Sequence, residues 1–392
     1  MEEAANEACR VGTGMRVGVD VTPLLGTRTG IGTYTAHLLQ ELARLQSDGL
    51  ELVATAFTGR RVVSLAEFLP SGVRVRSRRI PARFLRAAWL RVPFPPVELL
   101  TGPVDVFHGT NFKAPPTLRA ASVVTIHDLS YLRMPETVDA ESLGYQHLVP
   151  SALARGARVC TVSAAVASEV QEAYDLDADR ITVTPLGVDP SWYTASPMRP
   201  PVEIGSDYVV AVGMIEPRKN LQVLLHAYRL AADRAIQLPP LLLIGPQGWG
   251  STLDTSGIPA NRIVQAGYLP YGTLQGVVAG AQLLAFPSLY EGFGLPPLEA
   301  LATGVSVLAS DLPVTREVLG DQATYADPRS AEAMLGGLLE ALERPAGTRE
   351  TRQDRARLFT WERCAAATLD AYRQAALAGG GRANRAAPYS PL

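Results

Sequence analysis

The chain of 392 residues has little cysteine, little net charge and no long apolar run. Its three cysteines, Cys9, Cys160 and Cys364, show no CxxC spacing. This argues against a disulfide framework and against a zinc site, and it favours a reducing cytoplasm. The net charge of −2 argues against a strongly basic nucleic-acid binder. No apolar run approaches the roughly 18 residues that span a bilayer, and the acidic N-terminus lacks the apolar region of a signal peptide. We therefore expect a cytoplasmic protein.

The sequence also lacks the glycine fingerprints of common nucleotide-binding enzymes. The turn at residues 26–32 has neither the Lys-Ser/Thr of a P-loop nor the GxGxxG spacing of a dinucleotide site, and the turn at residues 245–250 lacks that spacing too. This argues against a nicotinamide-dependent oxidoreductase. Glycines at a helix N-terminus can still approach a phosphate or a sugar closely. Gly30, Gly32 and Gly245 are therefore candidate ligand contacts, with an ordinary glycine-rich turn as the alternative.

What the sequence has is an alternation of short apolar runs and helical patterns. Six such runs precede Pro190 and six follow it. Apolar runs separated by helices are typical of βαβ units in a parallel sheet. The expected fold class is therefore α/β, with two doubly wound, Rossmann-like domains facing a central cleft. The expected segments are a disordered N-terminus (1–14), an N-terminal domain (15–190), a proline-rich linker (191–206), a C-terminal domain (207–358), a terminal helix (359–378) and a disordered tail (379–392).

The richest candidate site is the string from Glu291 to Glu299. An apolar run leads into the glycines at 292 and 294, and a helix is expected to begin near Leu295, where the first turn tolerates the two prolines that follow. Free backbone N–H groups at that helix start attract an anion. The two carboxylates can accept hydrogen bonds from sugar or ribose hydroxyls. The alternative is a plain turn with a helix-capping acid.

Arg218 and Lys219 form a second candidate site. They follow an apolar run that ends at Ile215, and they stand where a helix is expected to open. Cations oppose the dipole at a helix N-terminus, so local stability favours acids there. Two cations in this place indicate an anionic partner such as a diphosphate. The alternative is a solvated pair of turn residues.

Polar residues also stand at the ends of apolar runs in the N-terminal half. His127 and Asp128 follow one run, and His108 stands at the end of another. Because ligands bind at the carboxyl ends of parallel strands, all three are expected to face the cleft. A structural role is the alternative for each histidine. Ser163 is a candidate N-cap for the helix that follows it.

Taken together, the strings EPRKN and EGFGLPPLEALATG resemble those of family-4 retaining glycosyltransferases of the GT-B fold, and are most similar to bacterial mannosyltransferase-like members. The resemblance covers about residues 15–377. It implies that the C-terminal helix crosses back to the N-terminal domain. The implied catalytic residues are His127 beside the anomeric centre, Arg218 and Lys219 on the donor diphosphate, and Glu291 on hydroxyls of the transferred sugar. The implied donor contacts are Gly30, Gly32, Tyr268, Leu269, Gly292, Phe293, Gly294, Leu295 and Glu299. Gly245 is added to the donor contacts, and His108 and Asp128 to the acceptor side, because of their positions after apolar runs.

The implied reaction is transfer of a hexose with retention of configuration, with mannose from GDP-mannose as the first choice of donor. No DxD pair stands where it would hold a metal against a diphosphate, so no metal or other cofactor is expected. The residues at 270–272 depart from the acidic helix start common in the family, which leaves a UDP-sugar as an alternative donor. The acceptor stays open between a glycan, a lipid-linked saccharide and a small molecule. A non-catalytic nucleotide-sugar or polyanion-binding protein is the alternative from another class.

Residues 74–91 form a basic stretch, with seven arginines, no acid, and Phe84, Leu85, Trp89 and Leu90 interleaved. Such a pattern is typical of a segment that lies on anionic lipid. It favours peripheral contact with the inner face of the membrane, or steering of an anionic acceptor. The alternative is a solvated face with buried apolar side chains.

Overall fold

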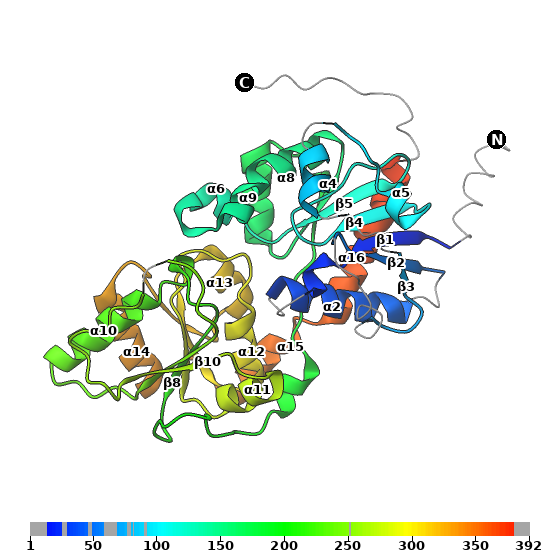
Figure 1. The fold of residues 1–392 in the computed structure, drawn as a ribbon. Coiled ribbons are helices and arrows are strands. Elements are labelled where there is room, and N and C mark those ends of the chain that lie inside the picture. Colours follow the sequence, from blue (N-terminus) through cyan, green and yellow to red (C-terminus); the bar gives the residue numbers. More distant parts are fainter. Residues whose placement is uncertain are drawn as a thin grey trace.

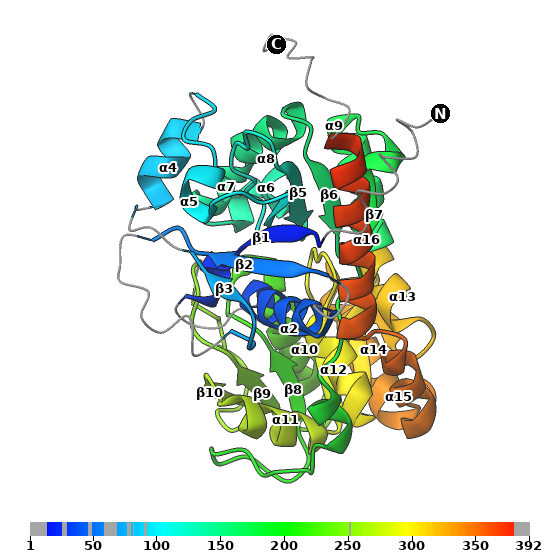
Figure 2. The ribbon, with the colours of Figure 1, turned by 90° about the vertical axis from the view of Figure 1, so that its right-hand side faces the viewer.

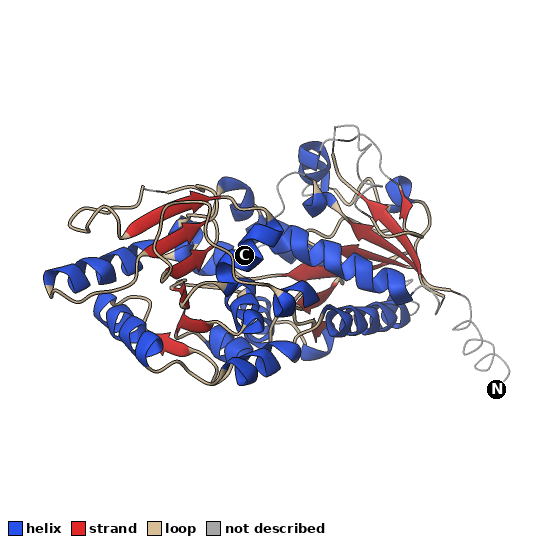
Figure 3. Cartoon of the chain, turned by 90° about the horizontal axis from the view of Figure 1, so that it is seen from below, coloured by secondary structure: helices blue, strands red, loops and turns tan. Residues whose placement is uncertain are grey.

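The computed structural model describes residues 14–25, 30–45, 49–58, 69–76, 80, 82–89, 92–250 and 252–379. Two α/β domains lie side by side, and each is built on one parallel sheet (Figure 1). In Figure 3 the strands of each domain lie among helices. The ends expected to be disordered lie outside the described residues, apart from Gly14 and Gly379.

The N-terminal sheet has seven strands in the order β3-β2-β1-β4-β5-β6-β7. The strands are β1 (Arg16–Asp20), β2 (Glu51–Thr55), β3 (Arg74–Val75), β4 (Val106–Gly109), β5 (Ala121–Ile126), β6 (Arg158–Thr161) and β7 (Ile181–Val183). The helices are α2 (Gly30–Arg44), α4 (Ala82–Trp89), α5 (Glu98–Thr101), α6 (Ser130–Arg133), α7 (Ala140–Leu143), α8 (Tyr145–Ala154) and α9 (Ala164–Tyr174).

The C-terminal sheet has six strands in the order β10-β9-β8-β11-β12-β13. They are β8 (Val209–Val212), β9 (Leu241–Ile244), β10 (Ile263–Gly267), β11 (Leu283–Phe286), β12 (Ser306–Ser310) and β13 (Thr324–Ala326). The helices are α10 (Leu221–Asp233), α11 (Tyr271–Ala279), α12 (Leu295–Thr303), α13 (Pro313–Leu319), α14 (Ala331–Glu343) and α15 (Arg349–Arg357). All neighbouring strands in both sheets are parallel.

The twelve apolar runs predicted as strands all contain one, which confirms the two parallel-sheet domains. The central strands are buried on both faces, as the continuous apolar runs require. The predicted helix at Ser163 is confirmed as well, because the Ser163 hydroxyl accepts a hydrogen bond from the Val166 N–H at the start of α9. The strand that the patterns missed is β3, which has two residues, both exposed.

The last helix, α16 (Trp361–Gly379), crosses back to the N-terminal domain as the resemblance implied. It packs against α2 and against β4 to β7, and Figure 2 shows it running along that domain. The chain thus passes between the domains twice, and the two passages lie together: the Val188 N–H donates to the carbonyl of Phe359 at 3.1 Å. A side chain at Gly187 would overlap the backbone of Trp361, so the passages are in close contact.

Two further findings concern the linker and the membrane. The 3-10 helix η6 (Pro190–Thr194), at the start of the predicted linker, lies against α12 with Trp192 fully buried, whereas most of residues 195–206 are exposed. Within the described residues, no helix is both long and apolar enough to span a bilayer.

Candidate active site

Three loops meet at the carboxyl ends of the strands. The strand order reverses between β1 and β4 in one sheet and between β8 and β11 in the other. Ligands of doubly wound sheets bind at such switch points. The loop after β8 carries Arg218 and Lys219, the loop after β11 carries Glu291, and His127 follows β5 directly. The Leu289 N–H donates to the Arg218 carbonyl at 2.9 Å, which joins the two C-terminal loops.

The two cations are ion-paired with Glu291. Lys219 Nζ lies 2.6 Å from Glu291 Oε1, and Arg218 Nη1 lies 3.1 Å from Oε2. A second acid, Glu216, accepts a hydrogen bond from Arg218 Nη2 at 2.8 Å. The exposed fractions of these four side chains lie between 6% and 16%. The two cations predicted to bind a diphosphate therefore share the buried carboxylate of Glu291, and Arg218 also pairs with that of Glu216.

This pairing determines the protonation of Glu291. Burial raises its pKa, but the charges of Arg218 and Lys219, with hydrogen bonds, outweigh burial and bring the pKa to about 2. Burial lowers the pKa of Arg218, but the charges of Glu291, Asp128 and Glu216 outweigh this effect and bring the pKa above its usual value. At neutral pH Glu291 is therefore an ionised acceptor of hydrogen bonds and has no proton to donate.

Lys219 is held in place from several sides. Its Nζ lies 5.0 Å from the centroid of the Phe286 ring. Gly213 lies beside the lysine, and a Cβ added there would lie 3.5 Å from Lys219 Cε, in ordinary van der Waals contact. The next residue, Asn220, has φ of 53° and donates its amide N–H groups to the carbonyls of Pro287 and Pro328, at 3.0 Å and 2.7 Å. These contacts fix the cation at the foot of a narrow pocket.

The start of α12 is as predicted. Gly294 precedes it with φ of 97°, and no side chain caps the helix. Pro296 and Pro297 have no N–H and the Leu298 N–H donates to the Gly294 carbonyl, so the backbone donors available at this turn are those of Gly294 and Leu295. Phe293 is buried and Leu295 is half-buried behind this turn. The helix start is thus free of a side-chain acceptor and lies one loop away from Arg218 and Lys219, which suits an anion.

Glu299, one turn into α12, has the opposite setting to Glu291. Burial raises its pKa, and nearby Asp189 raises it further, to about 8. Trp192 and Tyr271 lie at the same place, and the indole N–H of Trp192 donates to the Tyr271 hydroxyl at 2.9 Å. The charged neighbour of Glu299 is therefore the acid Asp189, whereas the charged neighbours of Glu291 are the cations Arg218 and Lys219.

His127 and Asp128 lie opposite the C-terminal loops. His127 is 8% exposed, its Nε2 lies 2.8 Å from the Thr110 carbonyl oxygen, and burial lowers its pKa, so the ring is neutral at pH 7. A Cβ added at Gly292 would lie 1.7 Å from the His127 carbonyl oxygen. Asp128 accepts hydrogen bonds from the Ser130 N–H and hydroxyl, and its charge acts on Arg218. The structure thus brings the predicted residues of both domains together.

The prediction for His108 is wrong. It lies fully buried beneath α16 instead of beside the candidate site, and its ring nitrogens are 2.7 Å from the hydroxyls of Tyr372 and Thr125. Burial lowers its pKa to about 3. His108 is the third of the four residues of β4 and points into the core, whereas His127 stands one residue beyond the end of β5.

The other predicted donor contacts lie around this centre. Gly30 and Gly32 begin α2, whose Tyr34 ring lies 5.0 Å from that of His127, while residues 26–29 of the same turn lie outside the described residues. The Gly245 N–H donates to the Gly267 carbonyl at 2.9 Å, which joins the ends of β9 and β10. Just beyond, Tyr268 is 61% exposed and Leu269 is buried.

Sequence reasoning missed Glu216, Asn220, Tyr290 and Glu317. Tyr290 and Glu317 form hydrogen bonds to the N-terminal domain. Their partners lie more than 100 residues away in the chain, so no local pattern reveals them. For Asn220, the sequence carries one signal, because asparagine tolerates the left-handed conformation that opens α10.

The basic stretch is described only in part. Arg74 and Arg76 are exposed, and Arg74 lies 3.6 Å from Glu51. Leu85 and Trp89 of α4 are buried in a cluster with Phe57 and Phe107, whereas Phe84 is 59% exposed. Residues 77–79, 81, 90 and 91 lie outside the described residues. Two of the interleaved apolar side chains thus belong to the core.

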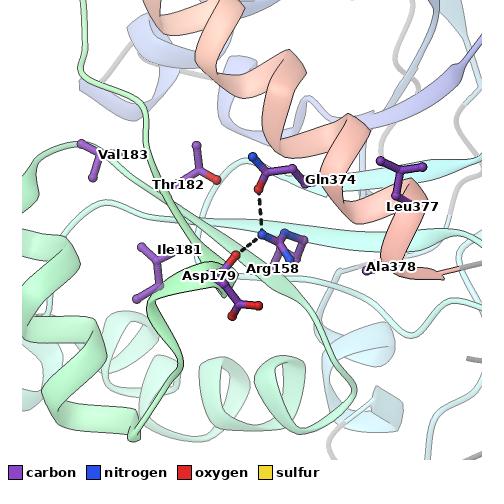
Figure 4. Close-up of a pocket in the computed structure, with 8 residues that line it drawn as sticks. All are labelled: Arg158, Asp179, Ile181, Thr182, Val183, Gln374, Leu377 and Ala378. Carbon is purple, nitrogen blue, oxygen red and sulfur yellow. Dashed lines mark hydrogen bonds between the residues drawn. The ribbon is translucent and has the colours of Figure 1, made fainter. Parts of the chain in front are cut away.

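A pocket of about 710 Å³ lies away from this centre, between β7 and the end of α16. Figure 4 shows Arg158 in it, hydrogen-bonded to Asp179 and Gln374. The pocket contains none of the residues predicted for the site, and it opens at an edge strand rather than at the strand ends. The loops around Arg218 and Glu291 are therefore the candidate active site.

Comparison with known proteins agrees with this geometry. The family model "Glycosyl transferase 4-like domain" matches residues 29–187, and "Glycosyl transferases group 1" matches residues 199–358. The chain is 33% identical to O-antigen chain mannosyltransferase B of Escherichia coli over 68% of this chain and 74% of that protein.

Solved structures show the same fold. Sucrose-phosphate synthase from Thermosynechococcus elongatus superposes with a TM-score of 0.68 at 18% identity, over 93% of this chain and all of that one. Anabaena HepE in complex with UDP superposes with a TM-score of 0.62 at 16% identity, over 91% and 98% of the two chains.

Proposed function

Since the chain belongs to the group 1 glycosyltransferases, with their family-4-like N-terminal domain and the GT-B fold, we propose that it transfers mannose from GDP-mannose to a saccharide acceptor with retention of configuration. The observation that carries this proposal is the buried cluster of Arg218, Lys219 and Glu291 at the carboxyl ends of β8 and β11. The choice of mannose is supported by the likeness to O-antigen chain mannosyltransferase B.

The donor diphosphate takes the place of the carboxylates on the two cations. Arg218 offers a planar fork of donors and Lys219 a compact charge. The N–H groups of Gly294 and Leu295 at the start of α12 add to these, since Pro296 and Pro297 have none. Negative charge grows on the diphosphate as the bond to the anomeric carbon breaks. Preorganised donors aimed at such developing charge are the largest catalytic contribution to expect. In this proposal they do the work without a metal.

Glu291, released from its ion pairs, accepts hydrogen bonds from hydroxyls of the transferred sugar. Its low pKa excludes a role as general acid, because it carries no proton at working pH. His127, neutral and adjacent to the Gly292 backbone, stands on the sugar side of the cluster. Glu299, one turn deeper in α12, binds the ribose.

In this proposal the acceptor hydroxyl attacks the anomeric carbon on the face from which the diphosphate leaves, and its proton passes to the departing phosphate oxygen. Enclosure between the two domains excludes water, which would otherwise compete as acceptor. Interdomain hydrogen bonds support such enclosure: the hydroxyls of Tyr290 and Ser163 and the indole N–H of Trp249 each donate one.

A donor screen tests the proposal. We expect GDP-mannose to raise the melting temperature more than UDP-glucose, UDP-N-acetylglucosamine or NADH, and to be consumed when an acceptor extract is added. Binding of NADH alone would contradict it. The likeness to HepE with UDP favours a UDP-sugar as the second candidate donor, and the same screen decides between them.

Peripheral membrane contact through residues 74–91 is a further part of the proposal, supported by the exposed Phe84, Arg74 and Arg76. It places the enzyme beside a lipid-linked acceptor. Flotation with liposomes that contain anionic lipid tests it: replacing Arg74 and Arg76 by glutamine and Phe84 by serine should reduce the bound fraction. An unchanged fraction would contradict it.

A further inference from the structure

Tyr290, the residue before Glu291, forms hydrogen bonds with both domains. Its hydroxyl accepts a hydrogen bond from the Leu129 N–H at 2.9 Å and donates one to Glu169 Oε2 at 2.6 Å. Its carbonyl accepts a hydrogen bond from Arg218 Nη1 at 2.8 Å. One residue therefore connects the donor-site arginine with the loop that follows His127 and with α9.

The neighbouring contacts join the same loops. The Ser163 hydroxyl donates to the Gly292 carbonyl at 2.8 Å. Because a Cβ on Gly292 would overlap the His127 carbonyl oxygen, the two loops lie in van der Waals contact beside the cluster. The charge of Asp128 raises the pKa of Arg218, which shows that the N-terminal loop reaches the cation across the domain boundary.

A second interdomain contact lies at Glu317 in α13. Its two carboxylate oxygens accept the N–H groups of Ala164 and Ala165 at 2.7 Å and 2.9 Å. These are the first residues of α9, the helix that carries Glu169. A carboxylate is stabilised at a helix N-terminus by the dipole and by the free N–H groups there.

From these contacts we infer that Tyr290 is a positioning residue that couples domain closure to the donor site, with Glu317 as a second latch. The inference rests on the proposed transferase function. When the domains close, the Tyr290 hydroxyl binds Leu129 and Glu169, and the same residue's carbonyl holds Arg218 where the diphosphate departs. A contact that is made only in the closed state biases the equilibrium towards that state. Loss of the Tyr290 hydroxyl therefore leaves the loop in place but shifts the protein towards open states.

Tyr290→Phe should change both the kinetics of transfer and the average separation of the two domains. The ring and its packing stay, while a neutral and a charge-assisted hydrogen bond are lost, so we expect kcat to fall about tenfold. The donor KM should change less than about threefold, because the two cations and the helix start that bind the diphosphate in the proposal all belong to the C-terminal domain. The share of donor hydrolysed by water should rise, since enclosure is weakened.

Tyr174→Phe is the matched control. The Tyr174 hydroxyl lies 2.8 Å from that of Tyr131, within the N-terminal domain and on the same helix α9, so its loss should leave kcat and hydrolysis unchanged. Glu317→Gln should show a weaker form of the Tyr290→Phe effect, because the amide keeps one acceptor oxygen but loses the charge. Equal kinetics and equal hydrolysis for wild type and Tyr290→Phe would overturn the inference.

Small-angle X-ray scattering of the unliganded proteins separates this inference from the proposed function. Tyr290→Phe and Glu317→Gln should have a larger radius of gyration than wild type and Tyr174→Phe. If no nucleotide sugar is turned over by wild type, the function is wrong, yet the scattering still decides whether these residues hold the domains together. An unchanged radius of gyration in both variants would refute the latch, whatever the kinetics show.

Discussion

Glu291 and Glu299 belong to one strand-loop-helix segment, yet their electrostatic surroundings have opposite charge. Glu291 is buried and Glu299 is half-buried, and the loss of solvent raises the pKa of each. Glu291 meets Arg218 and Lys219 from the loop after β8, and its pKa falls to about 2. Glu299 meets Asp189 from the passage between the domains, and its pKa rises to about 8. Tertiary neighbours, and not the motif, decide the charge that each acid carries.

The largest expected effect is the loss of transfer when the cluster around Glu291 is broken. Lys219→Ala and Glu291→Ala should each lower kcat/KM for the donor by at least about a hundredfold, because each removes a group that contacts developing charge or the sugar. Glu299→Ala should lower kcat/KM by less, since the ribose is remote from the reacting bond. Steady-state rates with matched circular dichroism spectra measure this. Wild-type rates in Lys219→Ala or Glu291→Ala would show that the site is elsewhere.

The second largest expected effect is a difference in the free energy of unfolding between variants of the two glutamates. Glu291→Gln leaves two buried cations without their shared counter-charge and should lower the free energy of unfolding by about 3 kcal/mol. Glu299→Gln should be nearly neutral at pH 7, because a carboxyl group with a pKa of about 8 is already mostly protonated there. Urea denaturation of the two variants, side by side, gives the difference. Equal destabilisation would remove the contrast between the two sites.

The pH dependence of donor binding sharpens the comparison further. If ribose hydroxyls donate to ionised Glu299, donor binding favours loss of its proton. The raised pKa of about 8 then means that affinity increases as pH rises from 6 to 8, by up to about tenfold per unit. Glu291, with its pKa of about 2, contributes no slope in this window. Calorimetry with GDP-mannose should show the slope in wild type and a flat profile in Glu299→Gln. The same slope in that variant would assign the titration to another group.

The smallest expected effect is that of metal removal. If Arg218 and Lys219 neutralise the diphosphate, dialysis against EDTA should leave transfer within about twofold of the untreated rate. Addition of Mg²⁺ should not rescue Lys219→Ala. Strict dependence on Mg²⁺ would mean that the Glu291 side of the site works with a metal after all.

The sequence was sufficient for the fold because buried parallel strands are continuous apolar runs, and each of the twelve runs contains a strand. It failed for β3, whose two exposed residues leave no such run. The same limit applies to the histidines: His108 and His127 both stand near strand ends, yet one points into the core towards Tyr372 and the other lies against Gly292. His108 lies one residue before the end of β4 and His127 one residue beyond the end of β5, and apolar patterns do not resolve this difference.

For the site, local motifs located the cations, the acids and the helix start, since these depend on neighbours in sequence. They did not reveal that Glu291 neutralises Arg218 and Lys219, because the pair spans 72 residues of chain. Nor did they reveal Tyr290 and Glu317 as interdomain contacts, because those partners belong to the other domain.

The most direct test of the central claim is a crystal structure with GDP-mannose bound. The account predicts the diphosphate within hydrogen-bond reach of Arg218, Lys219 and the start of α12, with mannose hydroxyls on Glu291 and ribose hydroxyls on Glu299. A structure in which the nucleotide sugar binds elsewhere, while Glu291 keeps both ion pairs, would contradict it.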